Sequence, residues 1–164
     1  MNKEETTSHT VTARNPQSAT RVWSPVAGHW LLVVAWMAVI FYLSAQSGLG
    51  GMELPAIFQT LRKGGHIFEY AVLGLLLGRA LIATWQAKGE TLSQSLYMRA
   101  WLVGVAIATA YAITDEIHQS FVPQRGGHVL DVMLDALSAA AALGFWYRAH
   151  LKQFAPNSPN RETM

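Results

Sequence analysis

Residues 30–43 read WLLVVAWMAVIFYL and are apolar throughout. The stretch without Asp, Glu, Lys or Arg extends back to Pro25, so about 19 residues are available to cross a hydrocarbon core of about 30 Å as a helix. A cleaved signal peptide is the alternative, but the polar leader before this stretch is long, and Leu43-Ser44-Ala45 is a poor cleavage site. The stretch therefore predicts an uncleaved membrane span.

Three further apolar stretches follow along the chain. They cover Ile67 to about Trp85, Met98–Thr114 and Val129–Tyr147. The Gly-rich segment at Ser44–Leu61 reads as a loop, in which Ala56–Leu61 could form a short interfacial helix. Four such stretches joined by short connections predict an all-α fold, a four-helix transmembrane bundle. A compact water-soluble four-helix bundle is the alternative, but the first stretch lacks the polar stripe of a soluble helix. We expect residues 23–150 to form the membrane domain. Residues 1–22 are expected to form a disordered tail, and residues 151–164 a second tail.

Composition supports a membrane protein and excludes several other classes. Charged residues make up 13% of the 164-residue chain and hydrophobic residues 51%, whereas soluble domains carry roughly 25% charged residues. The chain has no cysteine, which excludes a disulfide scaffold, and it is too apolar to be disordered over its whole length. A net charge of +2 without a run of basic residues gives no reason to expect a nucleic-acid partner.

The distribution of Lys and Arg predicts the orientation. If the amino terminus is inside, nine basic residues fall on inner segments and only Arg62, Lys63 and Arg125 fall on outer ones. Cytoplasmic segments of membrane proteins carry the excess of positive charge. We therefore expect both termini in the cytoplasm.

Most of the unusual polar residues fall at the outer ends of the four predicted spans. Ionisable groups at membrane depth are costly, and they are candidates for functional residues by default. The set comprises Ser44, Gln46, Lys63, His66, Glu69, Asp115, Glu116, His118, Gln119, Arg125, His128, Asp131 and Asp135.

A short motif occurs twice. Lys63-Gly-Gly-His66-Ile-Phe-Glu69 matches Arg125-Gly-Gly-His128-Val-Leu-Asp131 as basic, Gly, Gly, His, two apolar residues and an acid. If each copy opens a helix, the fold consists of two repeated helical hairpins. A helix amino terminus beside a cation favours an anion, phosphate above all. The alternative is that Gly-Gly merely turns the chain into a helix and that the match is chance.

Spacing within the predicted helices places several polar residues on common faces. Asp115 and Gln119 are four residues apart, as are Asp131 and Asp135, and Asp115 lies three residues before His118. Histidine and carboxylate at such spacing can serve as general acid and base or ligate a metal, or they can simply neutralise one another at the interface. The chain has no established metal-binding motif, so we expect no metal and no cofactor.

From these patterns two sets of candidate residues follow. Candidates for catalysis are His66, Asp115, Glu116 and His118. Candidates for ligand binding are Lys63, His66, Asp115, Glu116, Gln119, Arg125, His128 and Asp131. Tyr70 and Tyr111 are expected to pack between helices with one hydrogen-bond partner each, and Arg79 to extend its charge toward the inner interface.

At these residues the sequence resembles the VanZ-like family over about residues 40–145. The resemblance rests on Ser44-x-Gln46, on Lys63-x-x-His66-x-x-x-Tyr70 and on Asp115-Glu116-x-x-Gln119-x-Phe121-x-Pro123-x-Arg125-x5-Asp131. It implies a small multi-pass membrane protein of the cell envelope, and the founding member of the family is associated with resistance to the glycopeptide teicoplanin. The chain departs from the family pattern at Asp135, where Asn is usual, and at Ser138, where Gly is usual.

Three functions are compatible with these residues. The favoured one is a non-enzymatic protein that binds an anionic lipid or its headgroup at the outer face, with membrane lipid as its partner. The alternative is a membrane-embedded enzyme that acts on a lipid-linked phosphate or ester, with His66 or His118 as base. A purely structural role in a larger complex would fit the small-residue helix faces.

Overall fold

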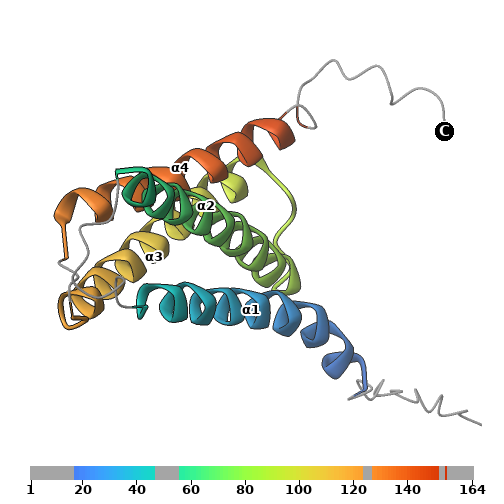
Figure 1. Ribbon diagram of the computed structural model, residues 1–164. Coiled ribbons are helices and arrows are strands. Elements are labelled where there is room, and N and C mark those ends of the chain that lie inside the picture. Colours follow the sequence, from blue (N-terminus) through green and yellow to red (C-terminus); the bar gives the residue numbers. More distant parts are fainter. Residues whose placement is uncertain (1–16, 47–55, 124–126, 152–153, 155–164) are drawn as a thin grey trace, which may run out of the picture.

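The fold consists of four long helices. The computed structural model describes residues 17–46, 56–123, 127–151 and 154, with side chains described from residue 25 in the first range and from residue 64 in the second. Within these residues the regular elements are α1 (Gln17–Ser44), α2 (Ala56–Ala87), α3 (Gln94–Ser120) and α4 (Val129–Leu151), as Figure 1 shows. The prediction of an all-α, four-helix bundle is confirmed.

Each helix contains a segment long and apolar enough to cross a membrane. These segments are Pro25–Ser44, Gly64–Ala87, Gln94–Ser120 and Val129–Leu151. Large apolar side chains also point outward, among them Leu31 (70% exposed), Val129 (78%) and Phe145 (79%). Such faces are unfavourable in water, whereas the hydrocarbon of a membrane solvates them. The helical backbone is also suited to lipid, since its polar groups are paired within each helix.

Helix α2 lies against each of the other three helices, and small residues let it approach α4 closely. A Cβ atom on Gly74 would stand 2.9 Å from the carbonyl oxygen of Ala139. The fully buried Leu143 side chain fills the space beside Gly78 of α2 and Gly104 of α3, where added Cβ atoms would lie 2.6 and 3.0 Å from it. Close packing through small residues is how transmembrane helices associate.

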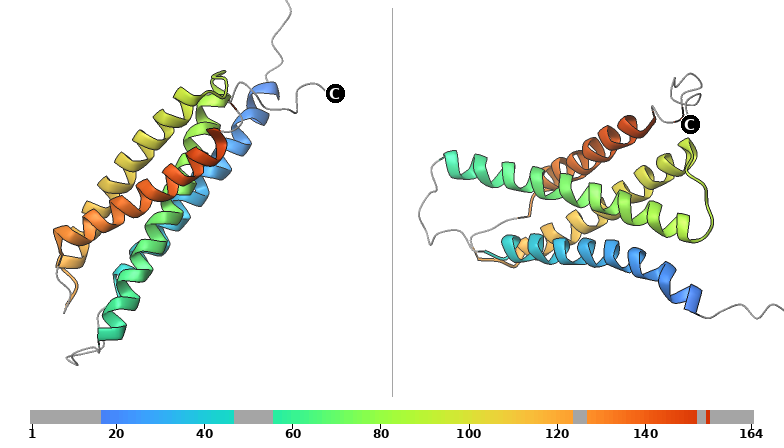
Figure 2. Two further views of the ribbon diagram at one scale, coloured as in Figure 1. Left: turned by 90° about the horizontal axis from the view of Figure 1, so that it is seen from above. Right: turned by 90° about the vertical axis from the view of Figure 1, so that its right-hand side faces the viewer.

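The α2–α3 connection lies at the same end of the bundle as the start of α1 and the end of α4 (Figure 2). Ser93 caps α3 by accepting a hydrogen bond from the Leu96 N–H. Next to the cap, Arg99 forms a 2.7 Å ion pair with Glu90 and lies over the ring of Trp85, 4.6 Å from its centroid. An aromatic and a charged anchor therefore mark this end of the bundle, as expected at a membrane interface.

Two helix boundaries differ from the expectation. Helix α1 begins at Gln17, within the segment expected to be a tail. Helix α2 begins at Ala56 and continues through Gly64 and Gly65, where the sequence motif predicted a helix start. That prediction is wrong for the first copy of the motif. Eight helical residues precede Gly64, so the helix is already nucleated, and each glycine then costs only about 1 kcal/mol.

Candidate functional site

Polar side chains from all four helices meet at the end of the bundle opposite the α2–α3 connection. They are Ser44 of α1, His66 of α2, Asp115, Glu116 and Gln119 of α3, and Asp135 of α4, and we refer to these six residues as the polar cluster. Five of the six are buried and His66 is half-buried. The convergence predicted from the sequence is thus confirmed for these residues.

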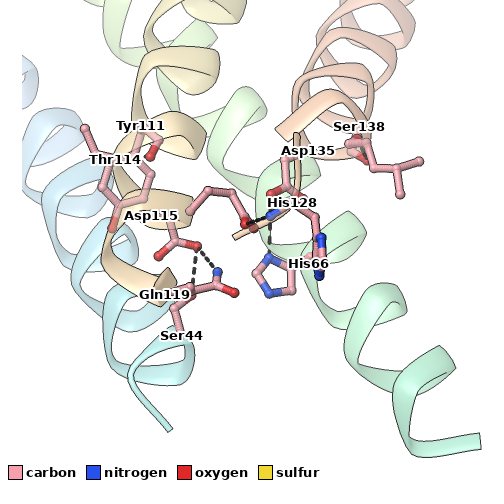
Figure 3. A network of polar contacts seen from close by, with 11 residues as sticks. Ser44, His66, Tyr111, Thr114, Asp115, Gln119, His128, Asp135 and Ser138 are labelled. Atoms are coloured by element: carbon pink, nitrogen blue, oxygen red, sulfur yellow. Dashed lines mark hydrogen bonds and ion pairs between the residues drawn. The ribbon is translucent and has the colours of Figure 1, made fainter. Parts of the chain in front are cut away.

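Asp115 connects α1 and α3 (Figure 3). Its Oδ2 atom accepts a 2.8 Å hydrogen bond from the Ser44 hydroxyl and a 2.9 Å hydrogen bond from the Gln119 side-chain amide. All three side chains are at most 3% exposed. The four-residue spacing on one helix face brings Gln119 to Asp115 as predicted, and together with Ser44 of α1 it gives the buried carboxylate two donors.

A second pair, His66 and Asp135, connects α2 and α4. The His66 Nδ1 atom lies 3.6 Å from Asp135 Oδ2, and the Asp135 side chain is 1% exposed (Figure 3). The separation is that of an ion pair rather than a close hydrogen bond. A histidine beside a buried carboxylate fits the alternative in which histidines and acids neutralise one another's charge.

Glu116 occupies the start of α4. Its Oε2 atom accepts a 2.7 Å hydrogen bond from the backbone N–H of His128, the residue before α4. Gly127 permits this approach, since an added Cβ would stand 2.7 Å from the Glu116 carbonyl oxygen. The amino terminus of a helix favours an anion, and at α4 that anion is a carboxylate of the protein itself.

Tyr70 lies one turn after His66 in α2 and is fully buried. Its ring centroid lies 6.4 Å from that of His66, with nearly parallel planes, and 6.3 Å from that of Tyr111, with tilted planes. Tyr111 donates a 2.6 Å hydrogen bond to the Met37 carbonyl, as expected for a packed tyrosine, whereas the Tyr70 hydroxyl has no partner among the described residues. The prediction of one partner for Tyr70 is therefore not met within that part of the chain.

Several buried oxygen atoms of the cluster have unused hydrogen-bonding capacity. Within the described ranges, Asp115 Oδ1, Glu116 Oε1 and both carboxylate oxygens of Asp135 accept no hydrogen bond. A buried acceptor without a donor costs about 1–3 kcal/mol, and more when it is charged. His66 Nδ1, which faces Asp135 Oδ2 at 3.6 Å, is likewise without a close hydrogen bond in this part of the chain.

Other predicted site residues lie differently. His118 stacks on Phe41 of α1 at 4.2 Å, and its Nε2 atom is buried without a partner among the described residues. Gln46 donates to the Tyr42 carbonyl within its own helix end and is exposed. The His128 side chain is exposed, so it is not equivalent to His66 despite the repeated motif. Asp131 and Glu69 are half-buried, and Arg79 is exposed.

The two predicted cations cannot be placed. Arg125 and the Lys63 side chain lie outside the described residues. Among the residues that the structure describes, no three His, Asp or Glu side chains stand together in a way that could hold a metal ion.

Sequence reasoning omits three residues from the candidate site. Asp135 and Ser44 carry cluster contacts. Both belong to the polar residues at the predicted outer span ends, but neither is among the candidates for catalysis or ligand binding. Tyr70 is expected only to pack between helices. Its position one turn after His66 is the available signal, because residues four apart share a helix face.

Comparisons with known proteins agree with these features. The family model described as VanZ/LLP1 matches residues 29–151, which include all six cluster residues. Neither a curated protein nor a solved structure matches the chain. Since the match spans most of the chain and all four apolar helices, the chain is a multi-pass membrane protein that belongs to the VanZ/LLP1 family.

Proposed function

We propose that this protein has a cell-envelope role and binds the phosphate-bearing headgroup of an anionic lipid through the polar cluster, at the outer face of the bacterial inner membrane. The observation that carries the proposal is the convergence of buried polar side chains from four otherwise apolar helices. Such a cluster costs folding free energy, so it is retained where a ligand uses it.

The charges near the cluster define how a phosphate would be held. The first Gly-Gly-His copy lies inside α2, and the start of α4 holds Glu116, so a cradle made of two free helix termini is not supported. Lys63 lies three residues before His66. Arg125 lies three residues before His128, whose backbone N–H donates to Glu116. We assign the phosphate to these two cations, because basic residues recognise lipid phosphates electrostatically.

Lipid analysis of the protein purified in native nanodiscs tests the proposal. Anionic lipid should be enriched over the host membrane, and Lys63→Ala and Arg125→Ala should remove the enrichment. Arg79→Ala is the control, since its side chain is exposed and basic but lies toward the other end of α2. Equal lipid composition in all four preparations would contradict headgroup binding.

The same experiment distinguishes the enzymatic alternative. In that alternative His66 or His118 acts as a base on a lipid-linked phosphate or ester, and the lipid pool would be converted rather than retained. A resistance role of the teicoplanin type is tested separately, by the minimum inhibitory concentration of teicoplanin in a susceptible host. We expect expression of the chain to raise this concentration, and Asp115→Ala to abolish the increase.

A further inference from the structure

We infer that His66 donates a ring N–H to the headgroup phosphate while Asp135 occupies its other ring nitrogen, so that the His66–Asp135 pair takes up one proton when the lipid binds. This inference rests on the proposed function and specifies how the same site is regulated. It follows from the contact between the two side chains, from their different depths in the bundle and from the chemistry of imidazole.

The contact between His66 and Asp135 is the polar link between α2 and α4 at this end of the bundle. His66 Nδ1 lies 3.6 Å from Asp135 Oδ2, and within the described residues neither this nitrogen nor either Asp135 oxygen makes a close hydrogen bond (Figure 3). The side-chain donors Ser44 and Gln119 are bonded to Asp115 instead. In the part of the chain that the structure describes, His66 is therefore the ion-pair partner of Asp135.

The two side chains lie at different depths, and His66 is the accessible one. The apolar span of α2 begins at Gly64, two residues before His66, whereas that of α4 begins at Val129, six residues before Asp135. With a helical rise of about 1.5 Å per residue, these positions are about 3 Å and about 9 Å from the ends of the spans. Accordingly, the His66 side chain is 16% exposed and the Asp135 side chain 1%. A phosphate at the membrane interface therefore meets His66, with Asp135 behind it.

Imidazole chemistry couples this phosphate to a proton. A neutral ring has one N–H and one acceptor nitrogen, so an ionised carboxylate at Nδ1 keeps the N–H there and leaves a lone pair at Nε2. A phosphate that approaches Nε2 would meet this lone pair, and two acceptors repel each other. With one more proton on the pair, either on the ring or on the Asp135 carboxyl, Nε2 carries an N–H and donates it to the phosphate. Binding of the phosphate at His66 thus requires one additional proton.

Other titratable side chains lie at the same end of the bundle. They are Lys63, Glu69 and Tyr70 of α2, Asp115, Glu116 and His118 of α3, Asp131 of α4 and His128 directly before it. Two variants separate the pair from these groups. In His66→Gln, an amide presents its N–H to the phosphate at every pH. In Asp135→Asn, the amide N–H donates to Nδ1, so that a neutral ring carries its own N–H at Nε2. Neither variant needs the additional proton.

Isothermal titration calorimetry of the delipidated full chain in detergent measures both the affinity and the protons taken up per lipid. The probe is short-chain phosphatidylglycerol, whose phosphodiester keeps one negative charge throughout, so that changes with pH belong to the protein. For the wild type we expect uptake to approach one proton, and Kd to rise by up to about tenfold per pH unit once the lipid-free pair has lost its proton, between about pH 6 and about pH 9.

The variants assign the proton. His66→Gln and Asp135→Asn should each show little proton uptake and a nearly constant Kd. His29→Gln is the matched control and should behave as the wild type, because His29 is exposed, lies in the first half of α1 and contacts the Pro25 carbonyl of its own helix. Asp135→Asn preserves the shape of the side chain, so the assignment does not depend on whether His66→Gln folds.

Two results would overturn the inference and leave headgroup binding intact. The first is binding of phosphatidylglycerol to the wild type with the same Kd over the whole pH range and without proton uptake. The second is proton uptake that persists unchanged in the variants, since the proton then belongs to another group. If phosphatidylglycerol does not bind at any pH, the proposed function itself fails.

Discussion

The Ser44 hydroxyl at the end of α1 donates a 2.8 Å hydrogen bond to the Asp115 carboxylate near the end of α3, across 71 positions of sequence. Both side chains are almost completely buried. Helix α1 otherwise packs mainly on α2, so this bond is a specific link between the first and third helices. It fixes the carboxylate that also accepts the hydrogen bond from Gln119.

The first prediction concerns this link. Ser44→Ala removes one donor from a buried carboxylate and should lower the free energy of unfolding by about 1–3 kcal/mol. Ser138→Ala is the matched control, because among the described residues the Ser138 hydroxyl donates to the Leu134 carbonyl one turn earlier in α4 and to no other helix. Thermal unfolding in detergent micelles measures both. Equal melting temperatures for the two variants would show that the Ser44–Asp115 bond contributes no stability.

The second prediction compares two glycines of α2. Gly74→Ala should destabilise the bundle, since its Cβ would meet the backbone of Ala139 at 2.9–3.3 Å and that backbone cannot move alone. Gly64→Ala meets nothing within 4 Å and lies within a helix, so it should stabilise the protein by up to about 1 kcal/mol. Melting temperatures of the two variants give the comparison. Destabilisation by Gly64→Ala would instead favour a helix that starts at this motif.

The limits of prediction from sequence are visible in α2. Its apolar part is predictable, because an apolar stretch as long as a membrane is thick is typical of a membrane-spanning helix. Its start is not, because two adjacent glycines resemble a helix boundary, whereas nucleation of the preceding residues decides where the helix begins. Similarly, the Asp115–Gln119 pair follows from spacing within one helix. The His66–Asp135 pair does not, since it depends on how α2 and α4 pack, and helical periodicity does not contain that information.

The third prediction concerns orientation. Nine of the twelve basic residues fall on segments at one side of the predicted topology, which places both termini in the cytoplasm. A phosphatase reporter fused after Ser120 should be active outside, and a fluorescent reporter fused after Met164 should fluoresce inside. A periplasmic or extracellular location at Met164 would place the polar cluster on the cytoplasmic side.

The fourth prediction concerns a phenotype of the chain, such as teicoplanin tolerance. Lys63→Ala, Arg125→Ala and Asp115→Ala should each abolish it while the protein still accumulates in the membrane, because each removes a proposed ligand contact. Arg79→Ala should retain it, and immunoblotting of membranes gives the abundance. Wild-type activity of the Arg125 variant at equal abundance would remove Arg125 from the site.

The fifth prediction is that no metal ion takes part in lipid retention. The described residues offer no group of three metal-ligating side chains, and the phosphate is assigned to two cationic side chains. Treatment with EDTA should therefore leave the bound lipid unchanged, as measured by phosphorus analysis of the repurified protein. Release of lipid that is restored by a divalent cation would point to a metal-centred site instead.

The central claim is that the polar cluster binds a lipid headgroup, and ligand-induced stabilisation measures it most directly. A ligand that binds only the folded state raises the melting temperature, by an amount set by its concentration relative to Kd. Added anionic phospholipid should raise the melting temperature of the delipidated wild type and of Glu90→Gln, but not that of Lys63→Ala, which lacks one of the two cations assigned to the phosphate. An equal rise in all three proteins would show that lipid acts as a general solvent of the apolar helices and would contradict a headgroup site at the cluster.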